Sequence, residues 1–332
     1  MKSFRYLLSL IPSLLVIFGN LAGGNWVWLN SIYCLIVMVA MDWLSGENSK
    51  NNHATDSVPN LIMILHVVFH FSALGTLLFA FSSGTIHGIS LAGAILSTGL
   101  NSGISGIIPA HELIHRSQTG FRILGILNLF SVNYGHFYIE HIKGHHKNIG
   151  TKQDPATARR GESIYAFIFR TIPGQWMNAY RIEKQNEKWY NNFVFQITFL
   201  QFLFCLIVFF KLGFSCLVAY LLQGLLAVVL LEYVNYIEHY GLKRDPGQKV
   251  GIHHSWQSDV LSSRLTLLEL SRHPDHHHKA SRHYQHLASH AESPKLPSGY
   301  FGVFYFVFIP AIWFRIIHPI IDKHPYYIRK NS

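Results

Sequence analysis

The sequence from Asn192 to Tyr240 decides the fold, and it reads NFVFQITFLQFLFCLIVFFKLGFSCLVAYLLQGLLAVVLLEYVNYIEHY. It holds two apolar stretches, 192–210 and 214–236, each close to the roughly 20 residues that a membrane-spanning helix needs. A Lys-Leu-Gly turn separates them, and so short a turn makes the two helices antiparallel neighbours. The stretch ends at a Glu-His pair that includes His239. It therefore predicts a helical hairpin that crosses a membrane twice and carries a histidine at its end.

Composition extends this interpretation to the whole chain. Of 332 residues, 49% are hydrophobic and only 13% are charged, which is unusual for a soluble domain of this size. The apolar stretches come in three close pairs, and a short turn joins the members of each pair. The six expected spans are 6–21, 26–44, 58–81, 86–110, 192–210 and 214–236. The sequence therefore predicts an all-α integral membrane protein with six transmembrane helices.

Lysines and arginines indicate the orientation of these spans. Of the 27 in the chain, only Lys211 lies in one of the three short turns. Because cytoplasmic segments carry the excess of basic residues, both termini and the two polar segments, 111–190 and 239–297, are expected on the cytoplasmic side. We therefore expect a single membrane-embedded domain over 1–332, with an uncleaved first span and a cytoplasmic cap rich in histidine.

Cysteines and net charge exclude several classes of protein. The three cysteines all lie in apolar stretches, so neither a disulfide framework nor a cysteine-based metal site is expected. The formal charge of +10 at pH 7 is explained by the basic residues that gather in the expected cytoplasmic segments of a membrane protein. Because the sequence contains no helix-turn-helix, zinc finger or aromatic-basic platform, we do not expect nucleic-acid binding. The remaining excess is histidine, with 22 residues that fall mostly in the polar segments.

These histidines form four clusters near the expected cytoplasmic ends of helices. The clusters are His111-Glu-Leu-Ile-His115, Glu140-His141-Ile-Lys-Gly-His145-His146, Glu238-His239-Tyr-Gly and His273-Pro-Asp-His276-His277. Spacings of three and four residues put side chains on one face of a helix. We therefore expect one locus each for His111 with His115, for His141 with His145, and for His273 with His276 and His277. Nine imidazoles exceed what one ion binds, so the sequence predicts a site with two metal ions.

The position of the clusters at the ends of apolar helices, rather than the type of ligand, indicates which metal is bound. Neutral imidazole suits zinc, copper, iron and nickel, so the ligands alone do not name the metal. Hydrolysis at zinc normally needs a polar substrate cleft, whereas these clusters lie at the ends of apolar helices. A membrane-dissolved substrate without a hydrolysable bond fits this setting better. Two iron ions that activate dioxygen are therefore the preferred prediction.

Acidic residues beside the clusters are expected to orient the ligands. They are Glu112, Glu140, Glu238 and Asp275. A carboxylate that accepts the second ring N–H of a histidine fixes its tautomer and makes it a better ligand. Direct metal binding by one of these carboxylates is an open alternative, but neighbours in a helix point in different directions. The sequence therefore favours the orienting role.

Two rival classes share part of this pattern. The first cluster matches HExxH, in which two histidines bind zinc and Glu112 would act as the general base of a membrane zinc protease. That interpretation leaves the other seven clustered histidines without a role. A metal transporter would place its ligands in the middle of the membrane. His66 and His70 do lie inside the third span, four residues apart, and we expect them to line a cavity or to be hydrogen-bonded rather than to bind metal.

These segments together resemble the membrane alkane 1-monooxygenases, within the wider group of histidine-box membrane hydroxylases and desaturases. The segments that carry the resemblance are 111–116, 135–146, 154–165, 235–242, 254–256, 272–277 and 296–300. The most discriminating is Asn235-Tyr-Ile-Glu-His-Tyr-Gly-Leu242. Acyl-lipid desaturases share the style of the other boxes but not this one.

The resemblance implies a fatty-acid-desaturase-like fold and a non-haem diiron enzyme that uses dioxygen to hydroxylate the terminal carbon of medium-chain alkanes to 1-alkanols. Its metal ligands would be His111, His115, His141, His145, His146, His239, His273, His276 and His277. Electrons would come from rubredoxin, itself reduced by rubredoxin reductase with NADH, at the bacterial inner membrane. Because the sequence has no CxxC pair, rubredoxin is expected to be a separate protein. A xylene-type hydroxylase and an acyl-chain hydroxylase or desaturase, each with a similar diiron site, are open alternatives.

Overall fold

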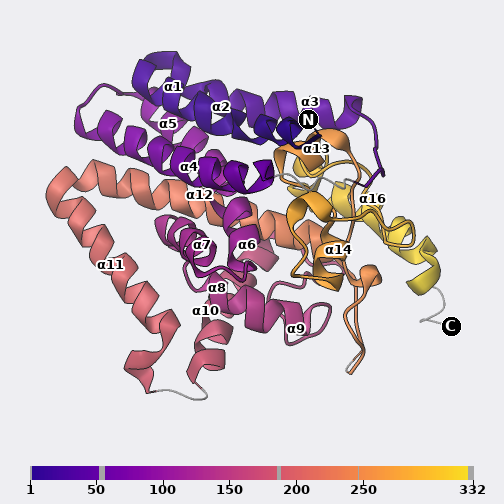
Figure 1. Ribbon diagram of the computed structural model, residues 1–332. Helices are drawn as coiled ribbons and strands as arrows, with labels where there is room; N and C mark the ends of the chain where they lie inside the picture. The colour runs from indigo at the N-terminus through magenta and orange to yellow at the C-terminus, as the bar shows by residue number, and fades with distance from the viewer. Residues whose placement is uncertain (1, 52–56, 185–187, 246, 328–332) are drawn as a thin grey trace. The chain divides into compact units, whose positions relative to one another are not determined.

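The computed structural model describes residues 2–51, 57–184, 188–245 and 247–327 (Figure 1). Within these ranges the regular structure is helical, and the only β pairing is two isolated bridges, Glu47 with Val260 and Gln257 with Lys295. The predicted all-α class is therefore confirmed. The chain divides into two compact units, the first over 1–37, 55–139 and 179–231, and the second over 38–54, 140–178 and 232–332.

The first unit contains most of the long apolar helices. Its elements are η1 (Lys2–Leu10), α1 (Ile11–Ala22), η2 (Gly24–Trp28), α2 (Leu29–Ile32), η3 (Tyr33–Val37), α4 (Val58–Ser82), α5 (Ile89–Asn101), η4 (Ser102–Ile107), α6 (Ile108–Ile114), α7 (Thr119–Ser131), α8 (Phe137–Ile139), η6 (Trp189–Asn191), α11 (Phe193–Leu212) and most of α12 (Phe214–His239). The segments marked η are 3₁₀ or π turns, and η3 and η4 are of the π type.

The second unit is built from shorter pieces. Its elements are α3 (Met38–Leu44), η5 (Glu140–His145), α9 (His146–Asn148), most of α10 (Ile164–Lys184), the end of α12, η7 (Ile252–His254), α13 (Leu261–Thr266), α14 (His273–His278), η8 (Tyr284–His286), α15 (Phe304–Val307) and α16 (Pro310–Lys323). Most of these helices are too short to be stable alone in water, so tertiary contacts must hold them.

Among the described residues, six helices are long and apolar enough to cross a membrane. They are Ser3–Ala22, Gly24–Leu44, Val58–Ser82, Ile89–Ile114, Phe193–Leu212 and Phe214–His239. The six predicted spans are confirmed, with ends that move by a few residues. The chain is therefore an integral membrane protein, and α11 shows the character of these helices most clearly. Its Phe199, Phe202 and Phe210 are 51%, 56% and 75% exposed, as expected of side chains that face lipid rather than water.

Local sequence sets the ends of α11. The Asn192 side chain accepts hydrogen bonds from the backbone N–H groups of Val194 and Phe195, which caps the N-terminus of the helix. Gly213 follows the C-terminus with a φ of 92°, a conformation that glycine adopts without strain. The Lys-Leu-Gly turn therefore ends one span and lets the next begin directly at Phe214.

The first unit is held together by polar contacts as well as by apolar packing. Helix α1 packs against α4 and α5, and Figure 1 shows these helices side by side. The Ser13 hydroxyl donates to Asn101 over 2.8 Å. His66 Nε2 lies 2.7 Å from the Ser9 hydroxyl, and His70 Nε2 lies 2.7 Å from that of Ser131. The two histidines are therefore hydrogen-bonded, which is one of the two roles expected for them.

Two further apolar segments of the sequence, 121–139 and 301–321, do not form continuous helices. The first, 121–139, is broken, because α7 ends at Ser131 and Asn133 takes a φ of 57° before α8 begins. The second, 301–321, is also divided, into α15 and α16. Pro310 explains this second break, since proline cannot continue a helix that precedes it but readily starts a new one. Neither segment is among the described helices that are long enough to span a membrane.

Gly19 allows the first helical hairpin to close. A Cβ atom at this position would lie 2.6 Å from the carbonyl oxygen of Trp26, which is closer than real contacts allow. Glycine is therefore required where α1 and η2 approach each other, as small residues are in many membrane helix pairs.

We predict that Gly19→Ala lowers the thermal unfolding midpoint in detergent, because the added methyl group costs about 1–3 kcal/mol of strain. Gly75→Ala in α4 is the matched control, because a methyl group there would meet no atom of the described residues within 4 Å. The control should be neutral or stabilising, since alanine favours a helix by up to about 1 kcal/mol over glycine. Equal behaviour of the two variants would contradict the close approach.

Candidate metal centre

Four histidines of the second unit converge on one point. His145 comes from η5, His239 from the end of α12, and His273 and His277 from α14; one ring nitrogen of each lies within 4.8 Å of those of the others. The Nε2 atoms of His145 and His277 are 3.3 Å apart, and those of His273 and His277 are 2.8 Å apart. All four residues are buried. The sequence separates these residues by up to 132 positions, and the fold brings them together.

A second cluster of the same unit is built from His141, His146 and His276. The Nε2 atom of His146 lies 3.0 Å from that of His141 and 3.1 Å from that of His276. The rings of His141 and His276 stack with their centroids 5.8 Å apart. The second unit therefore holds seven of the nine predicted ligands in two adjacent clusters, since the rings of His146 and His277 are only 4.4 Å apart.

The structure meets the expected pairings in part. The rings of His141 and His145 stack with centroids 5.5 Å apart, and His273 and His277 share the first cluster, as expected. His141 and His276 belong to the second cluster, however, so each expected group is divided between the two clusters. Segment η5 is a π-helix, whose repeat of i to i+5 brings His141 next to His146 and leaves His145 to face the first cluster. In α14, His276 likewise turns toward the second cluster and away from its neighbour His277, because consecutive helical residues point in different directions.

The remaining two predicted ligands lie in the first unit. His111 and His115 occupy the end of α6, with ring centroids 5.6 Å apart, so the expectation that they point together is met. Glu112 lies between them. Its Oε1 accepts a hydrogen bond from Arg116 Nε over 2.9 Å and forms an ion pair with a terminal nitrogen of the same guanidinium over 2.8 Å. An ion-paired carboxylate is a poor general base, which argues against the zinc protease interpretation of the HExxH sequence.

The residues of the first cluster fit a metal ion. Imidazole nitrogens about 2.0–2.1 Å from one ion, at tetrahedral to right angles, lie about 2.8–3.4 Å from each other, and the separations of 3.3 and 2.8 Å lie within this range. His239 Nδ1 donates to the carbonyl oxygen of His254 over 3.3 Å, so its buried Nε2 carries a lone pair, and no hydrogen-bond donor of the described residues reaches that atom. A buried, unpaired nitrogen is costly unless it binds something.

Burial keeps His277 in the form that binds metal. It lowers the pKa of His277 well below its ordinary value, and repulsion from His273, His146 and His145 adds to the effect. His277 is therefore neutral near pH 7. A neutral imidazole offers its lone pair to a cation, whereas an imidazolium cannot.

Asp154 is a functional residue for which the sequence interpretation assigned no role. Its Oδ2 accepts from His145 Nδ1 over 3.0 Å and from the Thr157 hydroxyl over 2.6 Å, and its Oδ1 accepts from the Ala156 backbone N–H. Burial opposes the charge of Asp154, but the contacts with His145 and Thr157 overcome it and lower the pKa of the carboxyl. The ionised Asp154 fixes the proton of His145 on Nδ1 and directs Nε2 to the cluster. The one signal in the sequence was its place at the start of the segment 154–165.

Glu238, one of the four carboxylates expected to orient ligands, contacts a ligand histidine directly. Its Oε2 lies 3.2 Å from His273 Nε2, and its Oε1 accepts from the Tyr300 hydroxyl over 2.8 Å. Because Nε2 is also the atom that faces His277, the carboxylate points to the same locus as the imidazoles. This geometry supports a role beside His273, and direct metal binding by Glu238 stays an open alternative.

Glu140 has a different environment from the one expected. Its two carboxyl oxygens accept from Asn178 Nδ2 at 3.0 and 2.9 Å, and Gly144 leaves the room that this contact needs. Burial raises the pKa of Glu140 to about 8, with Asp154 and Glu232 adding repulsion and Asn178 opposing the shift. Much of the Glu140 population therefore holds a proton at pH 7.

Asp275 contacts residues outside the two histidine clusters. It accepts from Arg282 and from the backbone N–H of Ala288, and it lies 2.7 Å from Nε2 of His290. Burial tends to raise the pKa of Asp275, but these contacts overcome it and lower it. These three contacts tie α14 to the segment 282–290, which differs from the expected role of orienting a ligand.

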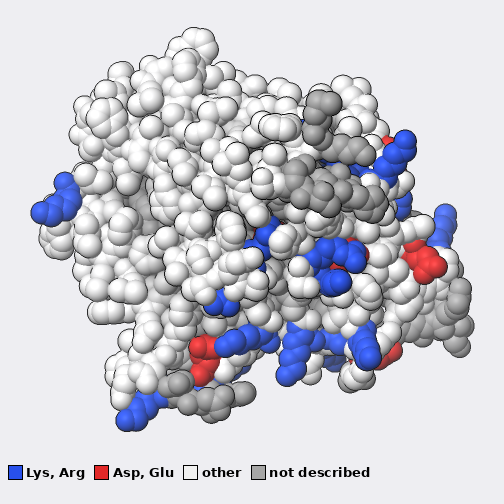
Figure 2. Space-filling model, in the orientation of Figure 1, with Lys and Arg blue, Asp and Glu red and all other residues white. Residues whose placement is uncertain are grey.

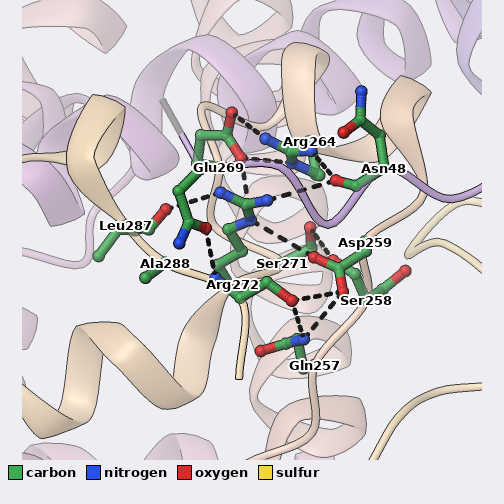
Figure 3. Close-up of polar contacts among 12 residues, drawn as sticks. Asn48, Gln257, Ser258, Asp259, Arg264, Glu269, Ser271, Arg272, Leu287 and Ala288 are labelled. Atoms are coloured by element: carbon green, nitrogen blue, oxygen red, sulfur yellow. Dashed lines mark hydrogen bonds and ion pairs between the residues drawn. The ribbon is translucent and has the colours of Figure 1, made fainter. Parts of the chain in front are cut away.

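Buried ion pairs hold α14 in place (Figure 3). Arg272, directly before His273, lies 3.4 Å from Asp259 and 3.6 Å from Glu269, and it donates to the backbone oxygens of Leu287 and Lys50. Arg264 pairs with Glu269 over 2.6 Å. Glu269 and its neighbour Leu268 have positive φ values of 58° and 52°. Such a backbone persists only when surrounding contacts over-determine it.

We predict that Asp154→Asn weakens metal binding about 10- to 100-fold, because the charge beside the His145 Nδ1 proton is lost and one of the two accepting oxygens becomes an amide donor. The metal content of purified protein after dialysis against graded chelator concentrations measures this. Asp322→Asn is the control, since Asp322 is 57% exposed at its side chain and pairs with Arg160. If both variants kept wild-type metal affinity, the role of Asp154 would be wrong.

We predict that Arg272→Met destabilises the protein by about 3–5 kcal/mol, because the buried carboxylates of Asp259 and Glu269 each lose a cationic partner. The midpoint of thermal unfolding in detergent should fall clearly. Arg160→Met removes the exposed pair with Asp322 and should lower the midpoint very little, because water screens such a pair. Similar midpoints for the two variants would show that the Arg272 pairs contribute little.

The face in view in Figure 2 has large areas without charge, and its lysines and arginines are gathered in a few places beside few acidic residues. Such a surface agrees with the six apolar spans. Spans of this kind, together with clustered imidazoles, define the class of the protein. It is an integral membrane protein whose histidines fit a metal site.

Comparison with known proteins identifies the family within this class. A family model of the fatty acid desaturases matches residues 86–307. Alkane 1-monooxygenase 1 of Alcanivorax borkumensis is 36% identical, with 85% of this chain and 74% of that protein covered. The alkane 1-monooxygenase of Ectopseudomonas oleovorans is 32% identical over 95% of this chain and 84% of its own length. The chain belongs to the fatty acid desaturase family and, within it, to the alkane 1-monooxygenases.

A further relative is a hydroxylase of the xylene type. The xylene/toluene monooxygenase hydroxylase component XylM of Pseudomonas putida is 28% identical, with 96% of this chain and 88% of that protein covered. The resemblance deduced from the histidine boxes is confirmed by these matches, and a monooxygenase is the class of enzyme that they share.

Proposed function

We propose that this protein is a diiron alkane 1-monooxygenase that hydroxylates the terminal carbon of medium-chain alkanes. The overall reaction takes an alkane, dioxygen, two electrons and two protons, and it gives a 1-alkanol and water. The observation that carries the proposal is the convergence of buried imidazoles in a chain whose relatives are named alkane 1-monooxygenases. Dioxygen activation is the chemistry that two bound iron ions would supply.

We assign the nine clustered histidines as the iron ligands. His145, His239, His273 and His277 would hold one iron. The other would be held by His141, His146 and His276 together with His111 and His115. The support for the first group is the separation of its nitrogens, and that for the second is the contact of His146 with His141 and His276. The pair from α6 is assigned by its position in the family's sequence pattern.

The residues around the ligands would set the state of each imidazole rather than take part in bond changes. Asp154 and the His254 carbonyl hold protons on the outer nitrogens of His145 and His239. Glu238 would either bind beside His273 or accept a hydrogen bond near it. Apolar side chains of the spans would admit only the end of a hydrocarbon chain, so that geometry selects the terminal carbon over weaker C–H bonds along the chain.

An electron donor must dock from outside, and we propose rubredoxin, reduced by rubredoxin reductase with NADH. The support is the monooxygenase activity named for the relatives, which consumes two electrons, and the basic character of the chain, with a formal charge of +10. A basic surface attracts an acidic electron carrier and speeds its association. We further propose a single hydroxylase domain over 1–332 in a bacterial inner membrane, with both termini and the polar segments in the cytoplasm.

We predict that anaerobically purified protein, reconstituted with ferrous iron, holds about two irons per chain, as a two-metal site requires. With rubredoxin, its reductase and NADH, it should convert octane to 1-octanol. His273→Ala should abolish iron retention at that site and product formation. Stoichiometric zinc with no oxygen consumption, and no gain on iron reconstitution, would overturn the proposal and favour the HExxH hydrolase.

The match to XylM supports a second candidate, a hydroxylase of aryl methyl groups. The same assay distinguishes the two when octane and para-xylene are supplied at equal concentrations. Faster formation of 4-methylbenzyl alcohol than of 1-octanol would favour the xylene-type function while leaving the metal centre unchanged.

A further inference from the structure

The C-terminal helix is followed by two tyrosines that contact the loop behind His239. This loop, Gly251 to His254, supplies the carbonyl oxygen that accepts from His239 Nδ1. The Tyr327 hydroxyl donates to the carbonyl oxygen of His253 over 2.5 Å. The ring of Tyr326 stacks on that of His253, with centroids 4.4 Å apart and an angle of 17° between the planes.

The His254 side chain links this loop to Tyr326 through a fixed tautomer. Its Nδ1 accepts from the Gly251 backbone N–H over 2.9 Å. Nδ1 therefore carries the lone pair, and Nε2 carries the proton. That proton is donated to the Tyr326 hydroxyl over 3.2 Å, and Gln248 Nε2 donates to the same hydroxyl over 2.7 Å. His254 is 1% exposed, so water does not replace these contacts.

Three short links thus connect the C-terminal segment to a histidine of the first cluster: Tyr326 to the His254 ring, the His254 ring to its own loop, and the loop carbonyl to His239. The loop has little regular structure of its own, because η7 is a single 3₁₀ turn. Without outside contacts its carbonyl would be free to move away from His239 Nδ1. A ligand imidazole that loses this acceptor also loses its fixed tautomer and orientation.

We propose that Tyr326, Tyr327 and His254 form a clamp that positions His239 for metal binding, so that the C-terminal segment is part of the metal centre's support. This inference rests on the proposed function, in which His239 is an iron ligand. These are positioning residues and not catalytic ones, because they act on His239 through the loop. The clamp should therefore affect how tightly and in what geometry the metal is held.

Cobalt(II) binding to the metal-free full-length protein in detergent tests the clamp, because the visible absorption of cobalt(II) reports its ligand geometry. Tyr326→Phe keeps the stack on His253 but removes the acceptor of His254 and Gln248. Combined with Tyr327→Phe, it should weaken cobalt(II) binding about 10- to 100-fold and shift the absorption bands. Tyr165→Phe is the control, because Tyr165 also donates its hydroxyl to a backbone oxygen, that of Phe308, and it should change neither quantity.

A second variant distinguishes loss of the clamp from unfolding of the protein. His254→Asn retains a side-chain acceptor for the Gly251 N–H but cannot reach Tyr326, and it should reproduce the spectral shift while far-ultraviolet circular dichroism stays unchanged. Wild-type affinity and spectrum in both the double variant and His254→Asn would overturn the clamp. Failure of the wild-type protein to bind cobalt(II) or iron would instead overturn the proposed metal centre, so the two failures are distinguishable.

Discussion

The second unit depends on the burial of imidazoles that face one another. In its first cluster the Nε2 atoms of His145, His273 and His277 approach to 3.3 and 2.8 Å, and burial keeps the central ring, that of His277, neutral. Ring nitrogens at such distances that direct lone pairs at one point are unfavourable neighbours until a cation occupies it. The fold must therefore hold these side chains against their own repulsion, and most of the polar structure around α14 and η5 serves that purpose.

Short and irregular elements supply this support. The π turn η5 distributes His141, His145 and His146 between two clusters, which a regular α-helix would not do. Before α14, the chain runs through two non-glycine residues with positive φ, Leu268 and Glu269. The buried pairs of Arg264 and Arg272 with their carboxylates hold that conformation. Strain at the entrance to a ligand helix is thus offset by charge pairs that are fully shielded from water.

Two different acceptors orient ligands from behind. His145 donates its outer nitrogen to the carboxylate of Asp154, and His239 donates its outer nitrogen to a backbone carbonyl. The carboxylate of Glu238 lies instead at the cluster-facing nitrogen of His273. A carboxylate makes the imidazole more electron-rich than a carbonyl does. The imidazoles of this cluster are therefore unequal in strength as ligands, and this difference is available to tune a bound metal.

The sequence by itself determined the spans, the four histidine clusters and the family, because twenty-residue apolar stretches and short boxes are local patterns. It also predicted an orienting role for Glu238, but the contact of Glu238 with His273 comes from the tertiary structure. Only the tertiary structure decided that His141 lies with His146 and His276, that Asp154 backs His145, and that Tyr326 supports the loop behind His239. These contacts depend on a π turn, on side-chain direction and on residues as far apart in the chain as His141 and His276. Residue spacing along one helix carries no information about such distances.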